Sequence, residues 1–581
     1  MTTECDYLIV GGGTAGCVIA NRLSADPRNR VVLLEAGRDM LPGQEEPAIL
    51  DSFPRIAYFN EANVWPALRV HLTEGASRAG TARRYEQARL IGGGSSLNDM
   101  QAPRGLPGDY DEWAQKGADG WDWASVLPYF RRLERDIDFN GDLHGADGPL
   151  TVRRIAEERW PLFSKAAAAA FHAAGYVEHA DQNGSFVDGF FPVAITNSDD
   201  KRVSTAIAYL DARTRARPNL TVISRAMVHR LQLNGCRVVG VGASTPSGPI
   251  SISARETVLS AGALHSPALL LRAGIGPAEA LRLLGIDVVA DRPGVGRNLM
   301  EHPALSVSSW IAPQARLKPE LRRHIHVALR YTSSLPGTVP SDMFMVAVSR
   351  TGWHPVGERI GSLLTYVNKS YSTGRVELVS PDPMSEPAVH FNMLSDPRDL
   401  TRLKEGMVRA AGLFTDPALA RITDVPFPTS YSERIRDLGV PSVRTWLLTS
   451  LLAHALDSGH VMRRLLIERL ITDGAPLQAL LARDDVMDEF VHSGVHGLWH
   501  PSCTCRMGRP DDPQAVTDSR GRVIGIEGLR VADASVMPVI PRANTNITTV
   551  MIGEKIADAI LADTKAEVPS LVASPSLLKQ V

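Results

Sequence analysis

The stretch YLIVGGGTAG, residues 7–16, decides the fold of the first part of this 581-residue chain. Its apolar residues predict a short buried strand. The glycine turn leads into CVIANRLSAD, residues 17–26, whose apolar spacing predicts a helix. RVVLLEAG, residues 30–37, predicts the next strand. Strand, turn, helix and strand over about 35 residues predict a βαβ unit at the start of an α/β fold.

The turn matches the G-x-G-x-x-G pattern of dinucleotide-binding folds. Its residues are Gly11, Gly13, Thr14, Ala15 and Gly16. Gly11 permits the tight turn, Gly13 lets a pyrophosphate approach the backbone, and Gly16 lets the helix pack on the strand. Glu35 ends the second strand, where it can accept hydrogen bonds from a ribose, and its charge disfavours the 2′-phosphate of NADP. The motif predicts a dinucleotide site and leaves NAD and FAD both open.

The bulk composition excludes several classes of protein. The net charge is −2, with 44% hydrophobic and 22% charged residues, which gives no basic excess for nucleic acid or for an anionic membrane. The five cysteines form an odd, sparse set that does not suggest a disulfide framework and favours a reducing compartment. The longest apolar-rich stretch, WLLTSLLAHAL, is far shorter than the roughly 20 residues of a membrane span. Since no leader is visible either, we expect a cytoplasmic protein without a membrane span.

Five further segments resemble the signatures of one family. They are ARLIGGGSSLNDMQAPRG (88–105), GALHSPALLLRAGIGP (262–277), PGVGRNLMEH (293–302), WHPSCTCRMG (499–508) and ANTNITTVMIGEKIADAI (543–560). Together with the glycine turn they resemble the glucose–methanol–choline (GMC) family of FAD-dependent oxidoreductases, over nearly the whole chain. Two other segments, APRGLPGDYDEWAQKGADGWDW and SDPRDLTRLKEG, look most like the bacterial furfural-alcohol and aryl-alcohol oxidases of that family.

The resemblance implies an α/β fold in two parts. One is a Rossmann-like FAD-binding domain, and the other is a substrate domain with an antiparallel sheet and flanking helices. The expected FAD-binding domain consists of residues 1–160, 200–310 and 491–563, the substrate domain of residues 161–199 and 311–490, and the tail of residues 564–581.

The resemblance also assigns cofactor residues beyond the first turn. In a second glycine loop, the backbone N–H groups of residues such as Gly93 and Ser95 are expected to meet the pyrophosphate or the flavin edge, and Asn98 is expected to hydrogen-bond the flavin. The alternative is a tight loop without a ligand. Some family members attach FAD through a histidine in this loop. Leu97 and Asn98 offer no such nucleophile here, so we expect non-covalent FAD.

Four more residues are assigned to FAD by the resemblance alone. Val228 matches a position where backbone meets adenine, although an ordinary core valine explains it equally well. Asp533 and Ala534 are expected to contact FAD. Trp499 is expected to wall the flavin site, with a core tryptophan as the alternative.

His500 matches the catalytic histidine of the family. A histidine, with an ordinary pKa of about 6.5, is suited to take the hydroxyl proton of an alcohol while hydride leaves for the flavin. Asn544 matches the partner position and is expected to donate to the same substrate oxygen, whereas the competing Asn546 would cap the last helix. That helix is expected from about Thr548, with Thr545 at the cofactor.

Two cysteines follow His500 and raise the question of a metal or redox site. Cys503 and Cys505 form a C-x-C pair, which is atypical of structural zinc sites and of redox-active CxxC pairs. We therefore expect no metal. The family has glycine where Cys503 stands, and this side chain either tightens the pocket or fills space.

The resemblance implies FAD-dependent oxidation of a primary, aromatic or heteroaromatic alcohol to the aldehyde, with O₂ reduced to H₂O₂. The alternatives are an alcohol dehydrogenase that uses a quinone or another acceptor, a hydroxynitrile-lyase-like FAD protein, and a flavin-binding protein without catalysis. The oligomeric state stays open.

The helical block within residues 425–490 is expected to be core, a lid or a subunit interface. Candidate apolar pocket walls are Phe344, Met345, Tyr366, Trp446 and Trp499.

Overall fold

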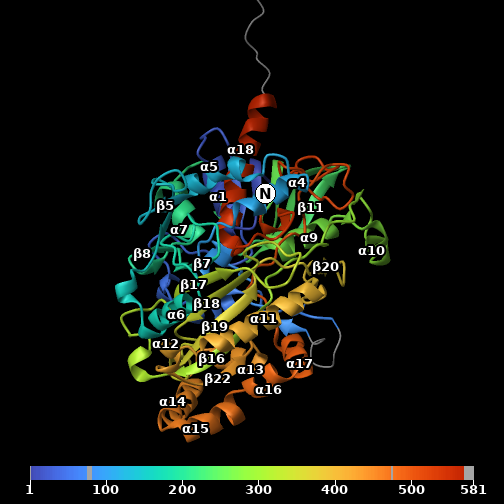
Figure 1. Ribbon diagram of the computed structural model, residues 1–581. Coiled ribbons are helices and arrows are strands. Elements are labelled where there is room, and N and C mark those ends of the chain that lie inside the picture. The colour runs from blue at the N-terminus through green and yellow to red at the C-terminus, as the bar shows by residue number, and fades with distance from the viewer. Residues whose placement is uncertain (1, 75–81, 473–474, 568–581) are drawn as a thin grey trace, which may run out of the picture.

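The computed structural model describes residues 2–74, 82–472 and 475–567 (Figure 1). A first sheet has seven strands, in the order β10-β2-β1-β13-β12-β11, with β23 on β13. Its parallel strands are β1 (Thr2–Val10), β2 (Val31–Leu34), β10 (Leu220–Ile223), β13 (Gly248–Leu259) and β23 (Leu529–Val531). The antiparallel strands β11 (Met227–Asn234) and β12 (Arg237–Thr245) complete it. Helix α1 (Thr14–Leu23) joins β1 to β2, which confirms the predicted βαβ unit.

The last helix returns to the first turn of the chain. Helix α18 (Thr545–Glu567) packs against α1, and Gly553 lies where an added Cβ would be 3.1 Å from Cβ of Val18. The helix begins at Thr545, three residues before the expected start, so Asn544 directly precedes its first turn. It also continues through Thr564, where we expected the tail to begin. The rest of that tail, residues 568–581, lies outside the described residues.

A second sheet is antiparallel and has six strands, in the order β22-β16-β19-β18-β17-β7. They are β7 (Gly189–Pro192), β16 (Ala304–Ile311), β17 (Ile325–Tyr331), β18 (Met343–Val348), β19 (Ile360–Val367) and β22 (Thr423–Thr429). Helices α6 (Leu162–Ala173) and α11 (Pro397–Leu413) pack against this sheet, and their apolar side chains share its core. A Rossmann-like part joined to an antiparallel sheet with flanking helices confirms the predicted fold class.

One strand does not follow the expected division of the chain. We placed residues up to 310 in the cofactor part, yet β16 pairs with β19 and β22 of the second sheet. Its apolar side chains, such as Val307 and Ile311, are needed in the core under α11. The division into two domains stays a prediction, and the pairing of β16 moves this boundary to before residue 304.

The helical block forms the end of the molecule opposite α18 in Figure 1. It comprises α13 (Glu433–Gly439), α14 (Val443–Asp457), α15 (His460–Leu466), α16 (Leu477–Ala482) and α17 (Asp484–Gly494). One side of α14, with Thr445, Thr449 and Leu452, lines the cavity described below. The other side exposes Trp446 and Leu451. The block therefore covers the cavity and also forms core, since Ala453 and Leu456 of α14 are buried against apolar residues of the second sheet. Across the described ranges, no helix combines the length and apolar character required to cross a membrane.

The packing of the first turn gives a stability prediction. If alanine replaced Gly16, its Cβ would clash with the carbonyl oxygen of Gly11. The clash could be relieved only by a shift of the backbone. We expect G16A to lower the free energy of unfolding by about 1–3 kcal/mol. Gly412 in α11 has open space at its Cβ position, so G412A should be neutral or stabilise by about 1 kcal/mol. Denaturant unfolding of both variants checks this, and equal stabilities would contradict the assigned packing.

Candidate active site

A cavity of about 1220 Å³ is lined by residues of both sheets. Most of the residues that we assigned from the sequence lie on its wall. They are Gly11, Gly13, Thr14, Ala15, Glu35, Gly93, Asn98, Val228, Trp499, His500, Asp533, Ala534, Asn544 and Thr545. Their convergence, from segments spread over the whole chain, makes this cavity the candidate active site.

Two assigned residues do not line the cavity. Gly16 packs against Gly11 inside the turn, which is the helix-packing role expected of it. Ser95 was expected to offer its backbone N–H to the cofactor, and this N–H donates to the carbonyl oxygen of Gly92 at 3.2 Å. Its hydroxyl donates to the same carbonyl oxygen at 2.6 Å, and the Thr205 hydroxyl lies 2.9 Å away. The side chain of Ser95 is therefore used to close its own loop.

The two glycine turns form one rim of the cavity. The Gly92 N–H donates to the carbonyl oxygen of Gly12 at 2.7 Å. A Cβ on Gly93 would lie 2.8 Å from Cα of Gly13, so only glycine lets the turns approach this closely. Beside them, Glu35 accepts hydrogen bonds from the Gly12 and Gly37 N–H groups at 2.8 and 2.6 Å. Its burial raises the pKa of the carboxyl. The rim thus joins bare backbone to an acidic side chain, as a dinucleotide requires.

Asp533 holds the start of a further helix beside this rim through hydrogen bonds. Its carboxylate accepts hydrogen bonds from the Gly262 N–H at 2.9 Å, the Ser266 hydroxyl at 2.6 Å and the Ser535 N–H at 2.8 Å. Gly262 begins helix α9 (Gly262–Arg272), whose first residues also line the cavity. Asp533 therefore positions a helix N-terminus as well as facing the cavity itself.

The structure brings Asn544, and not Asn546, to His500. Nδ2 of Asn544 lies 3.1 Å from Nε2 of His500. The side chain of Asn546 instead accepts a hydrogen bond from the Thr14 hydroxyl at 2.9 Å, which ties α18 to the first turn. Burial lowers the pKa of His500 well below its ordinary value, so the imidazole is neutral.

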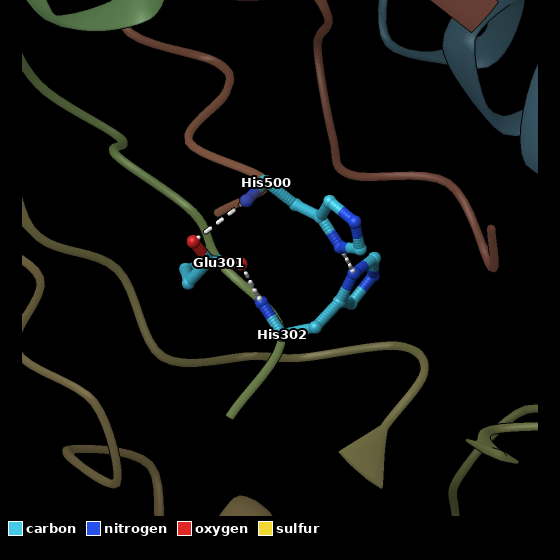
Figure 2. A group of neighbouring side chains, drawn as sticks. All are labelled: Glu301, His302 and His500. Carbon is cyan, nitrogen blue, oxygen red and sulfur yellow. Dashed lines mark hydrogen bonds between the residues drawn. The ribbon is translucent and has the colours of Figure 1, made fainter. Parts of the chain in front are cut away.

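Figure 2 shows Glu301 and His302 beside His500, and neither residue was assigned a role from the sequence. Glu301 accepts hydrogen bonds from the backbone N–H of His302 and of His500, both at 2.8 Å. Nδ1 of His302 lies 2.8 Å from Nδ1 of His500, and Nε2 of His302 lies 3.2 Å from the carbonyl oxygen of Pro541. Both residues stood in the quoted segment PGVGRNLMEH, but only the fold brings them to His500.

These contacts determine where the protons of the two histidines lie. The Pro541 carbonyl only accepts hydrogen bonds, so Nε2 of His302 carries a proton. Burial lowers the pKa of His302 to about 4, so that ring is neutral and its Nδ1 is a lone pair. His500 must then donate from its own Nδ1. Its Nε2 is left as the acceptor, beside the Asn544 amide. The arrangement therefore presents a neutral imidazole base at Nε2.

The same three residues lie close enough together to hold a metal ion. The hydrogen bonds, however, already use the atoms that a metal would need. Both Glu301 oxygens accept backbone N–H groups, and the facing nitrogens of the histidines are bonded to each other. We therefore treat the group as a proton-positioning device.

Cys503 and Cys505 lie in the turn after His500, and neither side chain lines the cavity. Their backbone N–H groups donate to the carbonyl oxygens of Ala534 and Ser535 at 3.1 and 2.8 Å. Both thiols are buried, and burial raises the pKa of Cys503 to about 12, so it is not a reactive thiolate. Cys503 has a φ of +74°, a left-handed conformation. That conformation explains why glycine suits this position.

Two regions of the chain match the sequence models of one protein family. Residues 5–304 and residues 370–553 both match GMC oxidoreductase, the first through the N-terminal and the second through the C-terminal model. The chain belongs to this family. Membership makes the protein an FAD-dependent oxidoreductase that acts on CH–OH donors.

Individual relatives extend over nearly the full chain. A 5-(hydroxymethyl)furfural oxidase of Methylovorus sp. (strain MP688) is 44% identical over 572 residues, which cover 96% of this chain and 99% of that protein. An oxygen-dependent choline dehydrogenase of Burkholderia pseudomallei (strain 1710b) is 33% identical over 600 residues, with 96% and 94% covered. The crystal structure of pyridoxine 4-oxidase from Mesorbium loti matches with a TM-score of 0.79 and 27% identity, covering 96% of this chain and 99% of that one.

The residues present fit FAD. Two glycine turns bring bare backbone together on the cavity wall, as a pyrophosphate would require, and Glu35 beside them offers an acceptor for a ribose hydroxyl. Near His500, Oδ1 of Asn544 and Nε1 of Trp499 are buried and have no hydrogen-bond partner among the described residues.

Trp499 lines the cavity, as expected, and so does Tyr366. Phe344, Met345 and Trp446 do not, which corrects those three candidate walls.

The left-handed conformation of Cys503 gives a second stability prediction. A variant with alanine at a given position is normally more stable than one with glycine, but a Cβ is unfavourable at this φ. We expect C503G to be more stable than C503A by about 1 kcal/mol. Cys505 is also buried but does not have a left-handed φ. At that position C505A should therefore be more stable than C505G. Denaturant unfolding measures all four, and the same order at both positions would contradict this explanation.

Proposed function

We propose that the protein oxidises a primary alcohol to the aldehyde, with His500 as the base and O₂ as the final electron acceptor. The observation that carries this proposal is the neutral His500, whose Nε2 acceptor stands beside Asn544 on the wall of the cavity that the glycine turns also line. Bound FAD, held without a covalent link, supplies the acceptor for the hydride that leaves the alcohol carbon.

The protein side chains manage the proton and the charge. Nε2 of His500 takes the hydroxyl proton, and the Asn544 amide donates a hydrogen bond to the substrate oxygen as negative charge develops. The protonated imidazole then carries a positive charge in a buried site, where it stabilises that negative charge. Because His302 fixes the other proton on Nδ1 of His500, the base needs no rearrangement before the reaction.

The cavity wall supports an aromatic or heteroaromatic substrate. One face of the second sheet contributes alternate residues, among them Val346 and Val348 of β18 and Leu364 and Tyr366 of β19. This apolar face suits a flat ring. The similarity to a 5-(hydroxymethyl)furfural oxidase and to a pyridoxine 4-oxidase, both named for heteroaromatic substrates, agrees with it. We also place the enzyme in the cytoplasm, since all five cysteines are unpaired.

Anaerobic mixing of the holoenzyme with benzylic, furanic and pyridinyl alcohols tests this function. We expect the flavin to bleach, and H500A to slow bleaching by about 10²–10⁴-fold because the base is lost. H172A, which replaces an exposed histidine away from the cavity, serves as the matched control.

The reduced enzyme is then mixed with air in a stopped-flow instrument. Rapid reoxidation supports the oxidase, whereas slow reoxidation points to a quinone or another acceptor. Absence of bleaching with every alcohol would contradict the proposed reaction and favour a lyase or a flavin-binding protein without catalysis.

A further inference from the structure

A second group of polar side chains lines the cavity outside the group around His500. Asp99 follows directly after Asn98, and His324 immediately precedes β17 of the second sheet. Arg323 joins the two segments, since its guanidinium donates to the carbonyl oxygen of Asp99 and to that of Ile325. Asp99 and His324 therefore meet where the loop that carries Asn98 reaches the second sheet.

Both side chains carry hydrogen-bonding atoms that the described part of the chain leaves unsatisfied. Oδ1 of Asp99 and both ring nitrogens of His324 are buried without a hydrogen-bond partner. Nε2 of His324 lies 3.5 Å from Oδ1 of Asp99, which is longer than a good hydrogen bond. Buried polar groups are normally paired, so three unpaired atoms in one place indicate a missing ligand.

The two side chains are held in place and face the cavity. The His324 side chain is fully buried, and the ring of Phe53 packs edge-on against it with the centroids 4.9 Å apart. Asp99 keeps 28% of its side chain exposed and lines the cavity wall. Gln101 lines the same cavity, and its Oε1 is also buried without a partner. The pair thus offers one carboxylate acceptor and one imidazole on the cavity wall.

The charges around this pair restrict the class of ligand. Burial alone would raise the pKa of the Asp99 carboxyl, but His324 and the arginines Arg55, Arg323 and Arg202 lower it to about 2. Burial lowers the pKa of His324 to about 3. At neutral pH the pair is therefore a carboxylate and a neutral imidazole. A cation would be repelled by the arginines, and an anion would meet the carboxylate.

A neutral hydroxyl group satisfies both members of the pair. It donates its proton to the Asp99 carboxylate and accepts a hydrogen bond from the N–H of the His324 imidazole. We propose that Asp99 and His324 form a subsite for a substrate hydroxyl other than the one that is oxidised, so that the preferred substrates are neutral diols. This inference rests on the proposed alcohol oxidation and names its substrate class.

A matched pair of substrates tests the subsite. 1,4-Benzenedimethanol and 4-methylbenzyl alcohol share a ring and differ by one hydroxyl, and kcat/KM is measured for both. A hydrogen bond to a charged group corresponds to a preference of about tenfold to a hundredfold. We expect the diol to be preferred by that factor, mainly through KM, beyond the twofold that its two reactive ends contribute. In D99A and H324F the preference should fall to about twofold.

Controls separate this subsite from the proposed reaction. H326F replaces another buried histidine two residues further on, which does not line the cavity, and should keep the preference of the parent enzyme. Flavin content confirms folding, and D99N replaces D99A if that variant loses flavin. Equal kcat/KM for diol and mono-alcohol in the parent enzyme, or a preference that survives both substitutions, would overturn the subsite while leaving alcohol oxidation intact. Failure of both alcohols to bleach the flavin would instead refute the proposed function.

Discussion

The arrangement of the site depends on the hydrogen bonds that the buried carboxylate of Glu301 accepts. It accepts the backbone N–H groups of His302 and His500 and the hydroxyl of Tyr85, and thus joins three segments that are distant in sequence. Beside it, Met300 and Ser502 exchange backbone hydrogen bonds of 3.1 and 3.2 Å. Loss of this carboxylate would leave buried N–H groups unpaired and free His500 from its place.

Burial and hydrogen bonding act together on His500. Burial makes the charged imidazole costly, so the resting base is neutral, and the contacts with His302 and Asn544 select the tautomer. The turn that carries this histidine is itself strained. Trp499 and Cys503 have φ values of +59° and +74°, which cost of order 1–3 kcal/mol each. The backbone pairing of this turn with residues 534–536 offsets that cost and keeps His500 at the cavity.

Local patterns in the sequence predicted the parts of the site that depend on local chemistry. The glycine turn, Glu35 and the strand–loop–helix at the end of the chain are short-range features, and the structure contains each of them. Glu301, His302, Asp99 and His324 carried no such signal, because their roles arise only when distant segments meet. The boundary at β16 failed for a similar reason. An apolar strand fits either sheet, and only its pairing partners decide between them.

Cys503 shows how a departure from the family pattern becomes intelligible in three dimensions. In the sequence it raised the question of metal or redox chemistry, and in the structure it is a buried side chain at a position whose φ favours glycine. His500, three residues before Cys503, lines the cavity, whereas Cys503 does not.

The tautomer of His500 tests this account most directly. ¹⁵N NMR of the holoenzyme labelled in histidine, with His500 assigned by substitution, distinguishes protonated from unprotonated ring nitrogens. We expect a protonated Nδ1 and an unprotonated Nε2 at neutral pH, with this preference lost in H302F. A protonated Nε2, a doubly protonated ring, or an H302F spectrum with the same tautomer would contradict it.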